Sequence, residues 1–370
     1  MKHLLAFLII SSLFFSCQKK ANQATVKTTL KSTIKYAKGF DIITIGNQKK
    51  LVIKKPYQNS KEEFTYLLGD KTDLSKNELK IPIKNIVVTS TTHISMLEQI
   101  GAEKYLTGFP QTKFISSEKT RKRIADGKVV ELGSERSMNT EKLLELAPNL
   151  VIGFGLNGNN KTYKTIMRNG IPVIYNGDWL EDTPLGRAEW IKFFGVLFNK
   201  EKEADSIFNV IESNYLAVKK IALKSKTIPT IISGNLFKDT WYMPAGKSFI
   251  ATYFKDANTN YIWKNTQGNG SLPLSIESVL DKGKDADFWI GCGLFESREE
   301  MLRSNQSYNS FNTFKNKNVY TYATNKGITG GLIYFEKAPV RPDLLLKDII
   351  KITHPNLLPN YSLTFFAKMN

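Results

Sequence analysis

Residues 200–224 read KEKEADSIFNVIESNYLAVKKIALK, and this stretch decides the fold. Apolar side chains recur in it at steps of three or four residues, from Ala204 to Ala222. That spacing predicts an amphipathic α-helix of about seven turns. Acidic residues gather near its start and lysines near its end, as the helix dipole favours. The stretch contains neither glycine nor proline, so we expect a straight, stiff rod.

Strand-like and helix-like patterns alternate on both sides of this rod, and the two sides look alike. Apolar runs such as 86–88 and 150–152 predict buried strands, and the stretches 93–100, 139–147 and 185–198 predict helices. Such alternation is typical of parallel sheets. The predicted fold class is therefore α/β, with two Rossmann-like lobes of parallel strands joined by a single long α-helix, plus a small N-terminal β add-on.

The predicted organisation has six parts. In chain order they are a lipoprotein signal peptide (1–16), a flexible tether (17–33), a β-hairpin add-on (34–80), an N-terminal lobe (81–199), the bridging helix (200–224) and a C-terminal lobe (225–370). Ligands of open α/β sheets bind at the carboxyl ends of the strands. The expected ligand site is therefore the cleft between the lobes.

The first residues are typical of an export signal. Lys2 and His3 precede the apolar run 4–10, which is too short to cross a membrane as a helix. Ser16 directly before Cys17 indicates a lipoprotein signal, in which Cys17 becomes the lipid-modified first residue. We therefore expect a protein that is lipid-anchored on the periplasmic side of the cell envelope. Secretion without an anchor is the alternative.

The net charge is strongly positive, +18 at pH 7. No basic run with interleaved aromatic residues stands out, so no nucleic-acid partner is expected for this exported chain. Solubility and attraction to an anionic membrane surface explain the charge, and an anionic ligand is the alternative explanation. If Cys17 carries lipid, Cys292 has no partner for an intrachain disulfide, so the fold depends on its core.

Two segments of the chain match each other. Residues 138–152 and 274–290 each contain a short capped helix with an acidic residue in its first turn, and then a buried strand. This layout resembles the periplasmic substrate-binding proteins of ABC importers for ferric siderophores and vitamin B12, over about residues 86–355. The resemblance implies that Glu141 and Glu277 dock onto arginines of an ABC permease in the inner membrane. Stabilisation of the two helix N-termini is the alternative role.

Ligand-facing candidates follow from the predicted strand ends. Aromatic walls suit a large, partly planar and partly apolar ligand, and an arginine suits its carboxylates or phosphates. Buried packing is the alternative role for each candidate. The candidates are Thr91, Thr92, His93, Arg136, Gly155, Asn157, Trp179, Trp241, Tyr242 and Tyr322.

One motif favours a different class of protein. Residues 153–158 read GFGLNG after a predicted strand, and Asp178 follows twenty residues later. This arrangement matches the dinucleotide-binding pattern GxGxxG. An exported dinucleotide-dependent oxidoreductase is therefore an alternative, although the glycines can equally serve a tight turn near a cleft.

The remaining chemistry argues against an enzyme. Beyond the export signal the chain has two histidines, His93 and His354, so we expect neither a bare metal site nor a cofactor. No nucleophile–base pair or pair of catalytic carboxylates stands out. The sequence thus predicts a monomeric substrate-binding lipoprotein of an ABC importer. Its expected ligand is a metal-chelate nutrient, with a ferric siderophore or other iron complex first and cobalamin second. A surface module that binds a partner protein is a third alternative.

Overall fold

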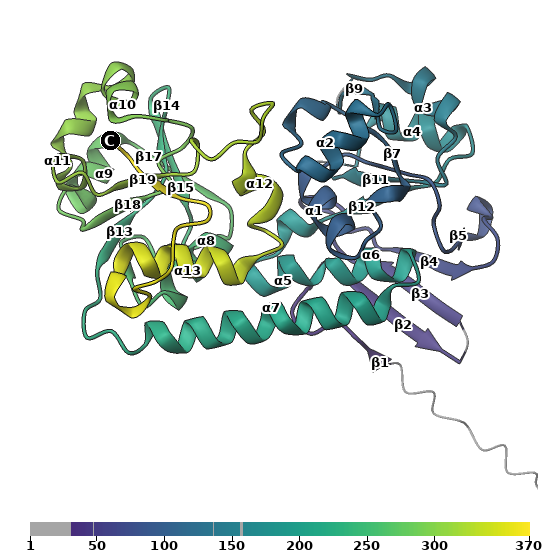
Figure 1. The fold of residues 1–370 in the computed structure, drawn as a ribbon, viewed down its shortest axis with the longest axis horizontal. Coiled ribbons are helices and arrows are strands. Elements are labelled where there is room, and N and C mark those ends of the chain that lie inside the picture. Colours follow the sequence, from purple (N-terminus) through teal and green to yellow (C-terminus); the bar gives the residue numbers. More distant parts are fainter. Residues whose placement is uncertain (1–30, 47, 136, 156–157) are drawn as a thin grey trace, which may run out of the picture.

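The computed structural model describes residues 31–370 except residues 47, 136 and 156–157. Two α/β lobes lie side by side along a long helix, and a further β-sheet lies beside the first lobe (Figure 1). Within the described part of the chain, no helix combines the length and the apolarity needed to cross a membrane. The predicted fold class, two lobes with parallel sheets joined by one long helix and an N-terminal β add-on, is confirmed.

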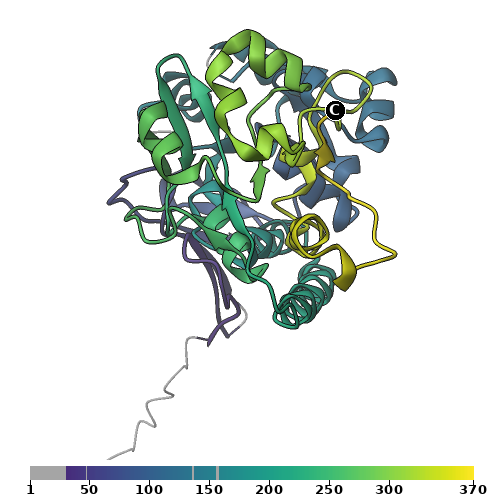
Figure 2. The ribbon, with the colours of Figure 1, turned by 90° about the vertical axis from the view of Figure 1, so that its left-hand side faces the viewer.

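The predicted rod is helix α7, Glu201–Ala222, which runs along both lobes (Figure 1). Its buried stripe divides between two cores. Phe208 and Ile211 pack in the core of the first lobe, and Tyr215 and Val218 pack in the core of the second. Figure 2, viewed from the second lobe, shows α7 end-on with α13 (Pro342–Thr353) beside it. The helix is therefore a structural part of each lobe as well as their connection.

The sheet of the first lobe is parallel throughout, with strand order β12-β11-β6-β7-β8. Ile86 and Val88 point into the core on one face and Val87 into the core on the other, as the strand pleat requires. Helices α1 and α6 contribute to the first of these cores, and α3 and α4 to the second. The strands are β6 (Ile86–Val88), β7 (Leu106–Phe109), β8 (Val130–Glu131), β11 (Leu150–Phe154) and β12 (Val173–Asn176), and the helices are α1 (Thr91–Gln99), α2 (Glu118–Ala125), α3 (Thr140–Leu146), α4 (Lys161–Arg168), α5 (Pro184–Glu189) and α6 (Ile191–Leu197).

The second lobe has the sheet order β16-β13-β18-β19-β20, in which only the last pair is antiparallel. A separate antiparallel sheet, β14-β15-β17, lies beside it. The strands are β13 (Thr230–Ile232), β14 (Asn235–Phe237), β15 (Thr240–Pro244), β16 (Asn260–Tyr261), β17 (Ser271–Leu274), β18 (Phe288–Ile290), β19 (Val319–Thr321) and β20 (Ala367–Lys368), and the helices are α8 (Phe249–Asp256), α9 (Ile276–Gly283), α10 (Arg298–Ser304), α11 (Asn312–Lys315), α12 (Ile333–Lys337) and α13.

Helix boundaries follow the sequence signals at most positions. The side chain of Asn139 accepts from the amide of Lys142 at the start of α3, as its position before an apolar stretch predicts. The helix predicted over 185–198 is instead divided into α5 and α6 at Trp190. The Trp190 indole is fully buried against Phe40 and donates to the carboxylate of Glu181. Glu181 lies only nine residues before Trp190, but Phe40 lies about 150 residues earlier, so the local pattern could not predict the packing at this break.

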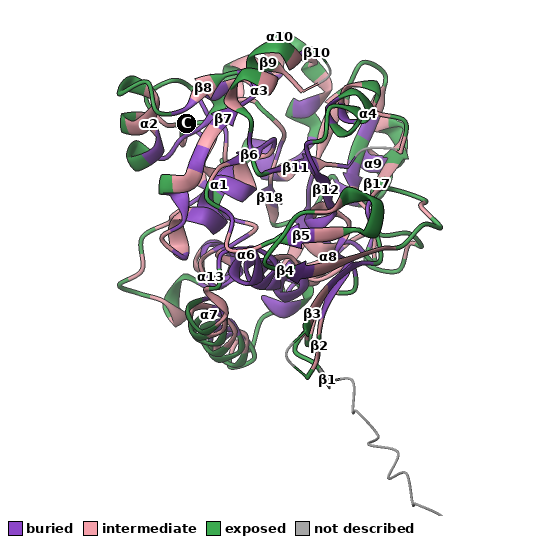
Figure 3. Cartoon of the chain, turned by 90° about the vertical axis from the view of Figure 1, so that its right-hand side faces the viewer, coloured by how far each residue is buried: buried purple, intermediate pink, exposed green. Residues whose placement is uncertain are grey.

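The N-terminal β add-on is larger than a hairpin. The predicted hairpin is β2 (Phe40–Ile45) and β3 (Gln48–Ile53), within a five-stranded sheet of order β1-β2-β3-β4-β5. Its other strands are β1 (Lys31–Ser32), β4 (Phe64–Gly69) and β5 (Glu78–Lys80). Figure 3 shows β2, β3 and β4 beside the buried helix α6. Phe40 and Leu51 are fully buried in the first-lobe core, so this sheet is built into the lobe.

Candidate ligand-binding site

Two cavities are lined by residues of both lobes, at the carboxyl ends of parallel strands. The Trp179 cavity has a volume of about 470 Å³ and the Thr91 cavity a volume of about 650 Å³. Both values lie in the range of about 300–1,000 Å³ that is usual for small-molecule sites. Phe335, on α12, lines both cavities. The two cavities therefore share a wall.

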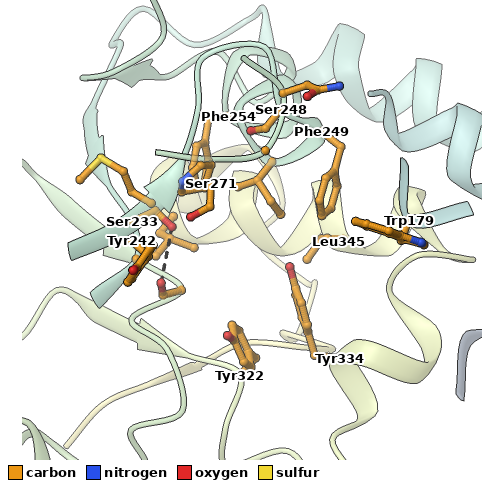
Figure 4. Close-up of a pocket in the computed structure, with 18 of the residues that line it drawn as sticks. Trp179, Ser233, Tyr242, Ser248, Phe249, Phe254, Ser271, Tyr322, Tyr334 and Leu345 are labelled. Carbon is orange, nitrogen blue, oxygen red and sulfur yellow. Dashed lines mark hydrogen bonds between the residues drawn. The ribbon is translucent and has the colours of Figure 1, made fainter. Parts of the chain in front are cut away.

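Aromatic rings form much of the wall of the Trp179 cavity. Figure 4 shows Trp179 and Phe249 facing Tyr322 and Tyr334 across the open space. The rings of Tyr322 and Tyr334 are stacked, with centroids 4.4 Å apart and 17° between their planes. Burial raises the pKa of Tyr322 to about 12, so its hydroxyl stays protonated and can donate a hydrogen bond. The other aromatic and hydroxyl side chains of this wall are Tyr242, Phe254, Phe366, Ser233, Ser248 and Ser271.

A half-buried cation, Arg187 of α5, also lines the Trp179 cavity. Its guanidinium lies over the ring of Phe249, 3.4 Å from the centroid, and donates to the carbonyl oxygen of Trp179. Asp178 is the nearby anion, and its Oδ2 accepts from Thr92 Oγ1 at 3.0 Å. Burial raises the pKa of Asp178 to about 6, although the positive charge of Arg187 opposes this rise. The cavity thus presents one cation that is fixed in orientation by stacking and hydrogen bonding.

The Thr91 cavity combines first-lobe strand ends with a second-lobe loop. Thr89, Ser90 and Thr91 follow β6, and Phe154 ends β11. The second lobe contributes Leu294, Glu296, Lys326 and Leu332 among others. Lys326 forms an ion pair with Glu296, and Glu135 accepts from the hydroxyl of Tyr163 at 2.8 Å. This cavity therefore has an apolar wall and several charged groups at its edges.

A sequence profile described as "Periplasmic binding protein" matches residues 86–325, which is more than half of the chain. The chain belongs to the periplasmic binding protein family. This family consists of solute-binding proteins, so the expectation of a binding protein and not an enzyme is confirmed.

Individual relatives fit the same assignment. The chain is 26% identical to an uncharacterized lipoprotein of Methanocaldococcus jannaschii, over 94% of this chain and 88% of that protein. It is 26% identical to the petrobactin-binding protein YclQ of Bacillus subtilis, over 56% of this chain and 62% of that protein. The crystal structure of the periplasmic heme-binding protein HutB of Vibrio cholerae has the same fold, with a TM-score of 0.54 at 17% identity, over 71% of this chain and 99% of that one.

The cavities of this periplasmic binding protein include four of the predicted ligand-facing residues. Trp179, Tyr242 and Tyr322 line the Trp179 cavity, and Thr91 lines the other. Thr92 lines neither and instead holds the carboxylate of Asp178. Arg136 and Asn157 lie outside the described residues.

Two predicted residues lie in the cores and not in the cavities. His93 is fully buried against the ring of Phe194, and burial lowers its pKa to about 3, so it is neutral. Trp241 is fully buried beside Trp289, and its indole donates to the carbonyl oxygen of Ser233 at 3.0 Å. His93 follows strand β6 as predicted, whereas Trp241 lies within strand β15, and both side chains point into the core. Both predictions of ligand contact are therefore wrong for this structure.

Gly155 is a third correction. A Cβ atom at this position would lie 2.1 Å from the carbonyl oxygen of Pro56. Gly155 therefore packs against the N-terminal sheet and lines neither cavity.

Several cavity residues were missed by the sequence reading. Arg187, Phe249 and Tyr334 lie on or at the start of short helices. Helical spacing cannot distinguish a side that faces a cavity from a side that faces the core. Leu345 and Ile349 of α13 also line the Trp179 cavity, and the helical pattern could not predict this for the same reason.

The two glutamates predicted to dock onto a permease are exposed. Glu141 lies in the first turn of α3 and Glu277 in the first turn of α9, in different lobes (Figure 1). Hydrogen bonds from its own amide and from Ser275 lower the pKa of Glu277, so it is ionised at neutral pH. Both carboxylates are thus accessible to a partner.

No cluster of three or more metal-binding side chains is present among residues 31–370, apart from the four positions not described. The side chains that line the two cavities are mainly aromatic rings, hydroxyls and aliphatic groups. Such a lining favours an organic ligand over a bare ion.

Proposed function

We propose that this periplasmic binding protein captures an iron complex, a ferric siderophore in the first place, between its lobes and delivers it to the permease of an ABC importer. The observation that carries the proposal is the Trp179 cavity, in which aromatic rings and hydroxyls surround one oriented cation, Arg187. Rings suit the planar, partly apolar arms of a chelator, and a guanidinium suits its anionic oxygens.

The combined size of the site supports a large ligand. The Trp179 and Thr91 cavities adjoin at Phe335, so one ligand can occupy parts of both. Metal would enter inside its chelator, because the cavity walls supply no ligand cluster of their own among the described residues. The petrobactin-binding relative and the heme-binding structure support iron complexes as the class to test first.

We further propose that the mature protein is a monomer anchored to the periplasmic side of the envelope through lipid on Cys17. Cys17 lies outside the described residues. Support comes from the signal-like sequence before it and from the lipoprotein names of two relatives. Glu141 and Glu277 are the proposed contacts with the permease.

Equilibrium dialysis of residues 18–370 tests this function. Ferric petrobactin, heme and cyanocobalamin are offered separately, with metal-free petrobactin as the matched control. We expect saturable retention of one iron complex at one equivalent per chain, and weaker retention of the metal-free chelator. Retention of cyanocobalamin alone would show that the ligand is cobalamin and not an iron complex. Retention of none of them by a folded protein would refute the proposal.

A further inference from the structure

The glycines at positions 155 and 158, which belong to the GxGxxG match, have a packing role in this structure. A Cβ atom on Gly155 would lie 2.1 Å from the carbonyl oxygen of Pro56, and one on Gly158 would lie 2.5 Å from the ring of Tyr57. Gly177, after β12, shows the same feature, because its Cβ atom would lie 2.2 Å from the carbonyl oxygen of Lys55. A side chain at Gly155 or Gly177 would clash with a backbone oxygen, and a side chain at Gly158 would displace the ring of Tyr57.

These three glycines therefore pack against three consecutive residues, 55–57, of the N-terminal sheet and its loops. The segment belongs to the connection between β3 and β4, residues 54–63, which we call the β3–β4 loop. A dinucleotide site needs its glycines open to a pyrophosphate. Here the β3–β4 loop covers Gly155 and Gly158, and the ring of Tyr163 lies against Gly153, so none of these glycines is open to a pyrophosphate. This packing removes the basis of the oxidoreductase alternative.

The start of the β3–β4 loop is also fixed by hydrogen bonds to Gly39. The amides of Lys54 and Lys55 both donate to the carbonyl oxygen of Gly39, at 2.8 and 3.0 Å. The amide of Gly39 in turn donates to Glu181 Oε1 at 2.7 Å. Glu181 is 4% exposed and lines the Trp179 cavity. A chain of hydrogen bonds thus connects the loop to the cavity wall.

Tyr57 and Pro56 fix the remainder of the loop. Pro56 is buried, and the ring of Tyr57 packs edge-on against Tyr175, with centroids 5.7 Å apart. The amide of Ser60 donates to the carbonyl oxygen of Tyr57 at 3.2 Å, which closes a turn around Gln58. The backbone on both sides of Gln58 is therefore anchored.

Gln58 itself lines the Trp179 cavity together with Trp179 and Glu181. Its side chain is exposed, and its amide group forms no hydrogen bond with any described residue. A primary amide offers two donors and one acceptor. Of the residues that line the cavity, Gln58 is the one contributed by the N-terminal sheet and its loops.

We infer that the N-terminal sheet is part of the ligand site: Gly155, Gly158 and Gly177 seat the β3–β4 loop so that Gln58 contacts the bound ligand through hydrogen bonds to its oxygen atoms. This inference rests on the proposed function for its ligand. It assigns Gln58 as a residue that determines specificity, and the three glycines as positioning residues.

Ligand affinity gives the first test. Gln58→Ala is expected to weaken binding of ferric petrobactin, measured by equilibrium dialysis, about three- to tenfold, as the loss of one or two hydrogen bonds implies. Gln48→Ala is the matched control, because it removes the same group from the exposed start of β3, and it should leave the affinity unchanged. Equal affinities of the Gln58→Ala variant and the wild type would overturn the ligand contact.

A second test does not depend on the ligand. Residues 18–370 with Gln58→Cys are labelled with bimane, a fluorophore that nearby tryptophan quenches. Cys292 is fully buried and should not react. We expect Trp179 to quench the bimane fluorescence, so Trp179→Phe should restore it. Gly155→Ala should restore it too, because the added methyl group displaces the β3–β4 loop.

Gly69→Ala is the control for the glycine variant, since a Cβ atom there meets nothing within 4 Å, and quenching should persist. Circular dichroism verifies that each variant is folded, and Gly177→Ala replaces Gly155→Ala if the latter is not. Unrelieved quenching in a folded glycine variant would overturn the seating of the loop. If dialysis detects no ligand but the bimane results are as expected, the proposed function and the contact of Gln58 with a ligand are both refuted. The packing of the β3–β4 loop against the glycines is then still supported.

Discussion

The main-chain amide of Ser116 donates to Oε2 of Glu336 over 2.6 Å. Ser116 lies in the first lobe and Glu336 on α12, which follows strand β19 of the second lobe, so this bond joins the two lobes. The Glu336 side chain is fully buried, and its Oε1 has no hydrogen-bond partner among the described residues. Burial raises the pKa of this carboxyl group to about 7.

The loop that precedes α12 strengthens this contact. Thr329 Oγ1 donates to the carbonyl oxygen of Lys113 at 2.8 Å. A Cβ atom on Gly331 would lie 2.2 Å from the carbonyl oxygen of Phe114. Residues 326–337 therefore cross from the second lobe to the first beside the Thr91 cavity, whose wall includes Leu332 and Phe335. We call this segment the lobe strap.

Gly331→Ala should loosen the lobe strap, because the new methyl group meets a backbone oxygen that cannot move alone. Overpacking of this kind costs about 1–3 kcal/mol. We expect a lower thermal midpoint and faster amide hydrogen exchange at Ser116. Gly69→Ala provides the comparison, because its methyl group enters open space. Unchanged exchange at Ser116 in the Gly331→Ala variant would contradict the contact.

The pKa of Glu336 predicts a pH dependence. The pKa of the Glu336 carboxyl group is 4.5 in the unfolded chain and about 7 in the folded protein, so the folded protein binds the carboxyl proton more tightly. The stability that the protonated group contributes is therefore lost as the pH rises from 4.5 to about 7. Glu98 raises this pKa and Lys337 lowers it. In Glu336→Gln the group cannot ionise. We expect the wild-type free energy of unfolding, relative to this variant, to fall across that window and stay level outside it. Parallel curves would contradict the assignment.

Arg187→Met should weaken binding of an anionic iron chelate by about tenfold or more, because it removes a charge-assisted hydrogen bond from a half-buried position in the cavity wall. Arg187→Lys keeps the charge but loses the planar contact with Phe249, so its affinity should fall between the two. Dissociation constants of ferric petrobactin for the three proteins provide the measurement. A dissociation constant of Arg187→Met equal to that of the wild type would show that Arg187 does not contribute to ligand binding.

The double charge reversal Glu141→Arg and Glu277→Arg should abolish import of the iron complex and leave its affinity unchanged. Both side chains are exposed and lie outside the two cavities. Glu145→Arg, at another exposed position of α3, is the control for charge alone and should preserve import. Lost ligand affinity in the double variant would refute the docking role.

The fold could be predicted because its determinants are local and periodic. The apolar spacing of residues 204–222 is a strong helical signal, and α7 begins and ends within two residues of the predicted limits. Asn139 and Ser275 are N-cap residues whose side chains accept the expected amide hydrogen bonds. Neither signal depends on distant residues.

The site could be predicted only in part, because it depends on where side chains turn. Trp179 and Trp241 both follow strands in sequence, yet one lines the cavity and the other fills the core. The role of Gly155 depends on Pro56, about a hundred residues earlier, and the sequence gives no sign of this pairing. Arg187 lies on a helix that ends before Trp190, whose indole packs against Phe40, about 150 residues earlier.

Tryptophan fluorescence during titration with ferric petrobactin tests the central claim, that an iron chelate binds in the Trp179 cavity. Residues 18–370 should show saturable quenching. Trp179→Phe should lose most of this change, whereas Trp263→Phe, which removes a tryptophan of the second-lobe core, should retain it. Quenching that is as large in Trp179→Phe as in the wild type, or the absence of saturable quenching in the folded protein, would contradict the account.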